Sequence, residues 1–213
     1  MIPFILYLFI LFRLNASPHA QIPGGSVLSV KTMSLNNRYP VPSVNEVFKQ
    51  NILLTLIYMK QKGTGDKVEI KSVDQPIHYS LTLHKGEVFA FHDKILPAYY
   101  GKVVATTHAH FNGEEGFRSD GYLTGDGVCH LASLIDYVAS SAGLRVEAPT
   151  SHDFANIPQV PKQYGVAIYT TPGEPTTSAQ QNLYITNTLG QDITMVFDYS
   201  HSLLKVSIIK QSS

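Results

Sequence analysis

Residues 125–144 read GDGVCHLASLIDYVASSAGL, and this stretch contains the lone cysteine of the chain. Apolar side chains recur in it at helical spacing, at Leu131, Leu134, Ile135 and Val138. This spacing predicts a helix over residues 128–142 with one face in the core. Gly143 stands where a left-handed helix stop is expected. Cys129 therefore falls in the first turn of the helix, directly after a Gly-Asp-Gly turn.

The position of Cys129 suits a nucleophile. The free N–H groups and the positive dipole end of a helix stabilise an anion and lower the pKa of a thiol there. Gly125 and Gly127 let a substrate approach the backbone, and the N–H groups from Gly127 through Val128 to His130 are candidates for an oxyanion hole. Cysteine is also among the most often buried residue types, so a packing role is the alternative.

A cysteine nucleophile needs a base, and three histidines are candidates. His152 lies where the chain returns from the helix, about twenty residues after the cysteine. His108 and His110 are two residues apart on a predicted strand, so their side chains project to one side. Such a pair suits zinc, but a site needs a third protein ligand, and none is located. We expect no metal and no cofactor.

Composition excludes several classes of protein. The chain has 213 residues, of which 44% are hydrophobic and 15% charged, which is globular rather than disordered composition. Its 16 basic and 16 acidic residues give zero net charge, so no nucleic-acid partner is expected. One cysteine excludes an internal disulfide and a cysteine-rich zinc site.

The N-terminal part of the chain divides into three segments. Residues 1–20 read MIPFILYLFILFRLNASPHA, typical of a signal peptide or short membrane anchor, although no positive charge precedes the apolar run. We expect an extracytoplasmic protein that meets the membrane only through this segment. Residues 21–42 are rich in Pro, Gly, Ser and Asn and are interpreted as a linker. Residues 43–85 are predicted to be a helix, with a Ser43–Glu46 capping box and an end at Gly63, followed by strands that pack on the domain.

The remaining segments favour β-structure, giving one α+β domain with an antiparallel sheet and two main helices, the second starting at the cysteine. Predicted strands lie at 67–73, 77–83, 164–170, 182–188, 192–200 and 203–210. Residues 86–97 are predicted to be a short strand that runs into a loop, and residues 101–127 a strand followed by a glycine-rich loop. Asp74-Gln75-Pro76, Gly190-Gln191 and Ser200-His201-Ser202 are the expected turns between them. The helix over 128–142 is expected to pack against antiparallel strands formed by residues 164–209.

Residues 125–147 resemble the signature of VanW domains, in which a glycine turn, a hydrophobic residue and a cysteine precede a helix closing on Ala-Gly-Leu. The residues that match are Gly125, Gly127, Val128, Cys129, Ala142, Gly143, Leu144 and Glu147. Weaker similarity on both sides extends the resemblance over about residues 86 to 209, so 86–210 is taken as a VanW-like domain. His130, where Gln is usual, His92, where Asn is common, and Tyr164, where a carboxylate often stands, depart from the family pattern.

The resemblance implies a function in the cell envelope. Some VanW-domain proteins look like cysteine L,D-transpeptidases, which join peptidoglycan stem peptides, so Cys129 is the implied nucleophile and His152 the first choice of base. Arg118 is a candidate for binding a substrate carboxylate, with a plain surface position as the alternative. Two other functions stay open: a non-catalytic module that binds peptidoglycan or a partner, and a hydrolase that forms the same thioester.

Overall fold

The computed structural model describes residues 25–61, 74–121 and 125–212, which form an α+β fold with two four-stranded sheets. Its helices are α1 (Pro42–Gln61), α2 (Val128–Ser141) and α3 (Pro175–Gln180), with the 3-10 helices η2 (Pro97–Tyr99) and η3 (Lys162–Tyr164). Its strands are β1 (Gly25–Ser34), β2 (Ile77–Leu83), β3 (Val88–Ala90), β4 (Val103–Ala105), β5 (Arg145–Glu147), β6 (Tyr184–Thr186), β7 (Ile193–Ser200) and β8 (Leu203–Gln211). The predicted fold class, with a second main helix that starts at the cysteine, is confirmed.

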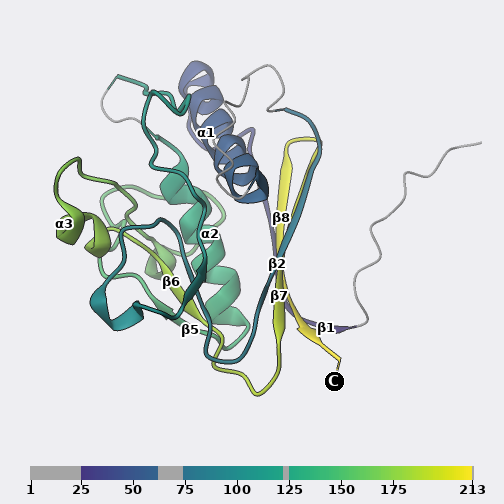
Figure 1. The fold of residues 1–213 in the computed structure, drawn as a ribbon. Helices are drawn as coiled ribbons and strands as arrows, with labels where there is room; N and C mark the ends of the chain where they lie inside the picture. Colours follow the sequence, from purple (N-terminus) through teal and green to yellow (C-terminus); the bar gives the residue numbers. More distant parts are fainter. Residues whose placement is uncertain (1–24, 62–73, 122–124, 213) are drawn as a thin grey trace, which may run out of the picture.

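The larger sheet is antiparallel, with the strand order β1-β8-β7-β2. Figure 1 shows it nearly edge-on, with α1 and α2 on one of its faces. Ser200 pairs with Leu203, so the β7–β8 hairpin has the predicted turn. His201 and Ser202 form it with φ of 49° and 59°, the left-handed geometry that matches the twist of paired strands.

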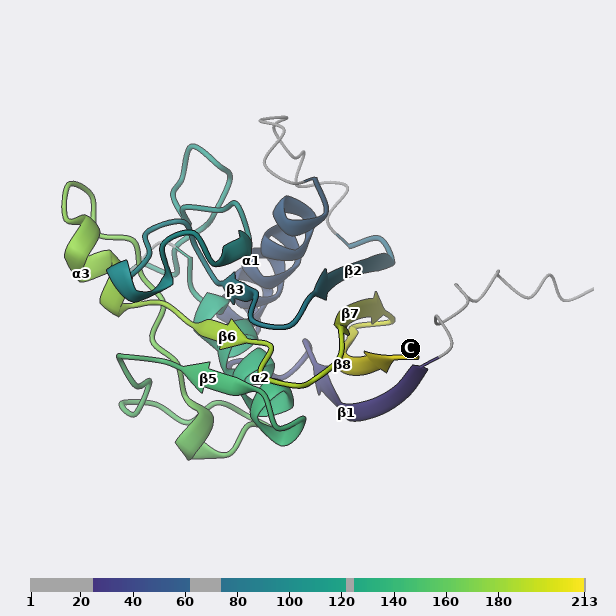
Figure 2. The ribbon, with the colours of Figure 1, turned by 60° about the horizontal axis from the view of Figure 1, so that its bottom comes forward.

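The smaller sheet has the order β4-β3-β6-β5, and its four strands are three residues each. The pair β3–β4 is parallel, and the other two pairs are antiparallel. Helix α2 packs against β1 and β8 of the larger sheet and against β5 of the smaller one. Figure 2 shows β5 and β6 in front of α2 and the larger sheet beside them. Helix α2 is thereby held from several directions.

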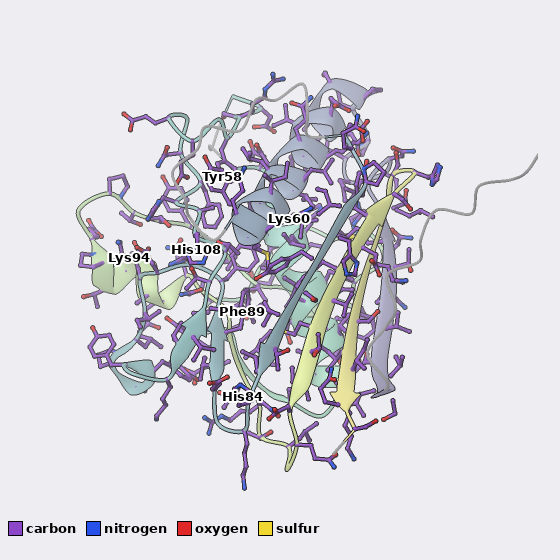
Figure 3. All side chains as sticks on the ribbon, turned by 45° about the vertical axis from the view of Figure 1, so that its right-hand side comes forward. Tyr58, Lys60, His84, Phe89, Lys94 and His108 are labelled. Carbon is purple, nitrogen blue, oxygen red and sulfur yellow. The ribbon has the colours of Figure 1, made fainter. Side chains whose placement is uncertain are left out.

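Both main helices are deeply buried. The predicted apolar face of α2 is confirmed, because Leu131, Leu134 and Ile135 are fully buried and Val138 is 1% exposed. Residues 51–56 of α1 are buried on every side of the helix. The reason is that α1 lies between α2, β2 and the loop around Phe117. Phe89 of β3 also points into this interior, as Figure 3 shows.

The predicted linker over residues 21–42 contains β1, so the structure corrects that interpretation. Residues 25–34 pair with β8 along the edge of the larger sheet. A register shift between Val27 and Ser29 marks a bulge, which breaks the two-residue alternation that identifies a strand. Val27 and Val30 are about half exposed, as suits an edge strand of mixed composition.

The sequence predicted that all the C-terminal segments are strands, and this prediction is wrong for some of them. Residues 164–170 make one isolated bridge, Ser151 to Val166. Their backbone bonds a neighbouring loop and α2: Ala167 N–H donates to Thr150 O at 3.0 Å, and Val166 N–H donates to Ser133 Oγ at 2.9 Å. The turn at Gly190-Gln191 joins two sheets, since β6 belongs to the smaller and β7 to the larger. The expected hairpin there is therefore wrong.

The start of α1 also differs from the prediction. The helix begins at Pro42, a residue that suits a first helical position because its missing N–H would be unpaired there. Ser43 thus lies inside the helix, and Glu46 Oε1 accepts a hydrogen bond from Gln50 Nε2 rather than closing a capping box. Gly143 has a φ of 80° and ends α2 as predicted.

Some predictions lie outside the described residues: the signal peptide or anchor over 1–20, the helix end at Gly63 and the strand over 67–73. In the part of the chain that is described, no helix combines the length and the apolar run that crossing a bilayer requires.

Candidate functional site

A cavity of about 850 Å³ opens at the N-terminal end of α2. Its walls come from the loop after β1, the first turns of α1, the start of α2 and the loops around residues 155 and 168. The lining residues are Asn36, Asn37, Arg38, Tyr39, Pro40, Phe48, Gly125, Asp126, Gly127, Cys129, His130, His152, Phe154, Ala155, Asn156, Pro158, Ile168 and Tyr169. This volume lies in the range of small-molecule and peptide sites.

The glycines before Cys129 are both needed for packing. Gly125 and Gly127 have φ of 93° and 92°, a region that residues with a side chain avoid. A Cβ on Gly127 would lie 2.7 Å from the backbone of Phe48, and one on Gly125 would lie 3.1 Å from Phe111 Cβ. Gly127 is therefore required where α1 crosses the start of α2, and both glycines also line the cavity.

Cys129 is the second residue of α2, in the first turn as predicted. The residue is half-buried and lines the cavity. Its Sγ accepts a hydrogen bond from Ile168 N–H at 3.4 Å and donates to Ile168 O at 3.6 Å. The thiol is thus held on the backbone of the segment that crosses the helix start.

The thiol of Cys129 is protonated at neutral pH, contrary to the prediction of a lowered pKa. Burial raises its pKa to about 11, the nearby Asp126 carboxylate adds to the rise, and the Ile168 N–H opposes it. Burial wins because a thiolate loses more in hydration than one helix end and one N–H return. A position at a helix start is therefore not enough to ionise this cysteine.

The predicted oxyanion-hole donors are largely engaged within the helix start. Val128 N–H donates to Gly125 O at 3.1 Å, and His130 N–H donates to Gly127 O at 3.0 Å. The N–H of Cys129 itself faces its own sulfur and lowers the thiol pKa slightly. Of the predicted set, this N–H is the one best placed to bind a developing anion beside the sulfur.

Two histidines line the cavity with Cys129. The rings of His130 and His152 lie edge to face with centroids 6.2 Å apart, and each residue is 6% exposed. Phe48 packs on His130 at 5.2 Å and the exposed Phe154 on His152 at 4.0 Å. The Nδ1 atom of each ring is buried without a hydrogen-bond partner. Both rings are thus available to a ligand, and the sulfur's own hydrogen bonds go to Ile168.

Both cavity histidines are neutral at physiological pH. Burial, with help from the nearby charges of Arg38 and His152, lowers the pKa of His130 to about 3. Burial also lowers the pKa of His152, although the carbonyl groups of His152 and Ala155 oppose the shift. A neutral imidazole can accept a proton, so the predicted base His152 is in the required form.

His108 and His110 do not line the cavity. Strand β4 ends at Ala105, so both lie in the following loop rather than on a strand, and His108 has a φ of 60°. His110 Nδ1 is 2.7 Å from Glu115 Oε1, and its Nε2 is 3.3 Å from Asp93 Oδ2. Burial opposes its charge, but these carboxylates raise its pKa overall. Figure 3 labels His108 on the side of the molecule that carries α3 and Lys94.

Arg118 is exposed and lies outside the cavity, whereas Arg38 lines it. The structure thus places a different arginine at the site from the one proposed on sequence. Arg38 falls in the stretch interpreted as a linker, where no periodicity indicated that an arginine would be buried. The cavity carboxylate is Asp126, whose pKa is raised to about 6 by burial and by Asp120.

No group of three His, Cys, Asp or Glu side chains among the described residues could hold a metal ion. His92, a departure from the VanW pattern, is fully buried away from the cavity, with Nε2 2.9 Å from Gln181 O. Comparison of the chain with protein-family models, with curated proteins and with solved structures found no match. The resemblance to VanW domains therefore stays a hypothesis that depends on the residues quoted for it.

Proposed function

We propose that the cavity is the active site of a cysteine-dependent acyl transferase that acts on peptides, of the peptidoglycan L,D-transpeptidase type. The observation that carries the proposal is that Cys129 and the neutral His152 line one cavity of about 850 Å³. Such a volume accommodates several residues of an extended peptide. The stem peptide as substrate, and a location outside the cytoplasm, come from the VanW resemblance and from residues 1–20.

The first step is attack of the Cys129 sulfur on a peptide carbonyl. Because the pKa of the thiol is about 11, few molecules carry a thiolate at neutral pH, and the proton must leave during the attack. His152 takes that proton, and the Cys129 N–H stabilises the developing oxyanion. When the C–N bond breaks, the protonated His152 returns the proton to the departing amine, leaving a thioester.

The second step returns the enzyme to its starting state. The amine of a second stem peptide attacks the thioester carbonyl, and His152 accepts the proton that the amine loses. The C–S bond breaks, and the sulfur regains a proton from the imidazole. If water attacks instead of the amine, the same site is a hydrolase, and it releases the terminal residue without joining two stems.

Intact-mass spectrometry of the protein lacking residues 1–20, incubated with the tetrapeptide L-Ala-γ-D-Glu-L-Lys-D-Ala, tests the proposal. We expect a thioester adduct on the native protein and no such adduct on Cys129→Ser. We expect His152→Ala to slow adduct formation by about 100-fold or more, the scale of losing a general base. His110→Ala, outside the cavity, is the matched control and should react normally.

The pH dependence sharpens this test. Burial lowers the pKa of His152, so the imidazole stays neutral below the usual histidine range. Adduct formation should therefore decline on the acid side at a pH below about 6.5, the ordinary histidine value. Chelators should leave the rate unchanged. An unaltered rate in Cys129→Ser would contradict the proposal.

A second function, a non-catalytic peptide-binding module, is favoured by the contacts of the sulfur. The thiol is held by both backbone groups of Ile168, and its pKa is raised rather than lowered. A binding module would hold the tetrapeptide equally well in the native protein and in Cys129→Ala, and neither would form an adduct. The same mass measurement, paired with calorimetry, separates the two functions.

A further inference from the structure

We propose that Arg38 binds a free carboxylate of the ligand in this cavity, so that the site takes peptides that carry an acidic group. The identity of the ligand as a peptide rests on the proposed function, but the carboxylate site rests on Arg38 and its surroundings. Arg38 lies outside the region that resembles VanW domains, because that region begins near residue 86.

The guanidinium of Arg38 is buried and held in place by neutral groups. The residue is 2% exposed. Its Nη1 donates to Pro158 O at 3.0 Å, and its Nη2 donates to Asn37 Oδ1 and Gln159 Oε1, both at 2.7 Å. Its Nε is buried and has no hydrogen-bond partner. One donor of a fixed, planar fork is therefore left for a group that enters the cavity.

The positive charge of Arg38 lacks a counter-charge in the described part of the chain. No described carboxylate lies within 4.0 Å of it, although the described residues form seven ion pairs of that length elsewhere. Burial lowers its pKa to about 10, which leaves it charged at neutral pH. A buried charge without a partner is unfavourable, so an anionic ligand group gains from the position.

The other titratable groups of the cavity favour a single negative charge. His130 and His152 are neutral, since burial lowers the pKa of each, so Arg38 is the permanent cation lining the cavity. A phosphate dianion would meet one cation and the carboxyl group of Asp126. A carboxylate matches one guanidinium, and the buried Nδ1 atoms of the two histidines can serve the uncharged polar groups of the ligand.

Arg38 and Cys129 line the same cavity, so one ligand can bring a carboxylate to the first and a carbonyl to the second. The tetrapeptide named above has two free carboxylates, on its D-Glu residue and at its C-terminus. Arg38 would select peptides by one of them. The C-terminal carboxylate would leave with the amine, whereas the D-Glu carboxylate would stay on the thioester.

Binding to Cys129→Ala separates this inference from catalysis, because that variant cannot form a thioester. Calorimetry should compare the free tetrapeptide with two analogues, one amidated at the C-terminus and one at D-Glu. We expect one amidation to weaken binding by about tenfold or more, the scale of a lost charge-assisted hydrogen bond. Which analogue loses affinity identifies the carboxylate.

Substitution of Arg38 is the second part of the test. In Cys129→Ala with Arg38→Gln, the free and the amidated peptide should bind equally. With Arg38→Lys, which keeps the charge but not the fork, part of the discrimination should return. Arg118→Gln, at an exposed arginine outside the cavity, should leave the discrimination unchanged. Discrimination that persists in Arg38→Gln overturns the inference.

A measurement on the protein with native Arg38 tests the inference even if the Arg38 variants fail to fold. Nitrogen-15 NMR of the arginine Nε–H signals, with sodium acetate as the probe, should shift the Arg38 signal and leave that of Arg118 in place. A static Arg38 signal together with equal binding of all three peptides overturns the inference. If binding depends on the carboxylate but the native protein forms no adduct, the role of Arg38 is supported and acyl transfer is rejected.

Discussion

Each end of α2 is marked by a glycine with positive φ, but the two glycines lie in different surroundings. Gly127 precedes the helix with a φ of 92°, and Gly143 follows it with a φ of 80°. A Cβ on Gly127 would meet the backbone of Phe48 at 2.7 Å, whereas a Cβ on Gly143 would meet nothing within 4 Å. Glycine is thus needed at the C-terminal end for conformation alone and at the N-terminal end for conformation and close packing.

The two halves of α2 also bury opposite kinds of titratable group. His130 in the N-terminal half is 6% exposed and Asp136 in the C-terminal half is 7% exposed. Burial lowers the pKa of His130 to about 3 and raises that of Asp136 to about 6, the latter against a hydrogen bond from Ser140. Both shifts favour the neutral form, so the two halves should respond to pH in opposite directions.

Substituting Gly127 should produce the largest effect on stability. Gly127→Ala places a Cβ against the backbone of α1 and forces a left-handed alanine, so we expect a loss of about 4 kcal/mol or more in unfolding free energy. Gly143→Ala carries the conformational cost alone, about 1–2 kcal/mol. Chemical denaturation of both variants measures the difference. Equal losses would show that the close approach of Phe48 is relieved without cost.

Acid should destabilise the N-terminal half through His130. An unfolded chain binds a proton at this residue below a pH of about 6.5, while the folded chain does so only near pH 3. Stability is therefore lost as pH falls through this window, by about 3 kcal/mol between pH 7 and pH 4. His130→Gln should remove that part of the acid sensitivity. Parallel stability curves for the two proteins would contradict a neutral, buried His130.

Removing the acid in the C-terminal half should stabilise the protein at neutral pH. The unfolded chain ionises Asp136 near its ordinary pKa of 3.8, whereas the folded chain keeps the proton to a pH of about 6. Stability therefore declines between these values, and Asp136→Asn should recover about 2–3 kcal/mol at pH 7.5. At pH 4 the variant and the parent should unfold alike. A destabilised variant at pH 7.5 would show that the folded protein favours the ionised form of Asp136, which contradicts the raised pKa.

Elements with local signals were predicted well. The apolar spacing and final glycine of α2, the alternation of β2, the presence of strands β7 and β8, and the tight turn at His201-Ser202 all matched the structure. Each depends on contacts between residues near one another in the chain or on a regular pattern of burial. The bulge in β1 removed that regularity, and the strand was missed.

The segment over residues 164–170 shows why alternation alone can mislead. Its side chains alternate in character as they do in a strand. Its backbone N–H groups, however, donate to Ser133 Oγ and Cys129 Sγ on α2. No pattern within the segment reveals that some of its partners are helix side chains. The same contact holds the cysteine, and its Ile168 N–H lowers the thiol pKa against the larger, opposite effect of burial.

The sequence by itself determined that a helix with Cys129 in its first turn lies between two left-handed glycines, because helix spacing and stop signals are local properties of the chain. Only the tertiary structure decided the chemistry of that position. It brought Arg38 and His152, which lie 91 and 23 residues from the cysteine, to one cavity and left His108, His110 and Arg118 outside it. It also buried the thiol. Burial and charge depend on every element that packs around a group, so they follow from the assembled fold rather than from a neighbouring stretch of residues.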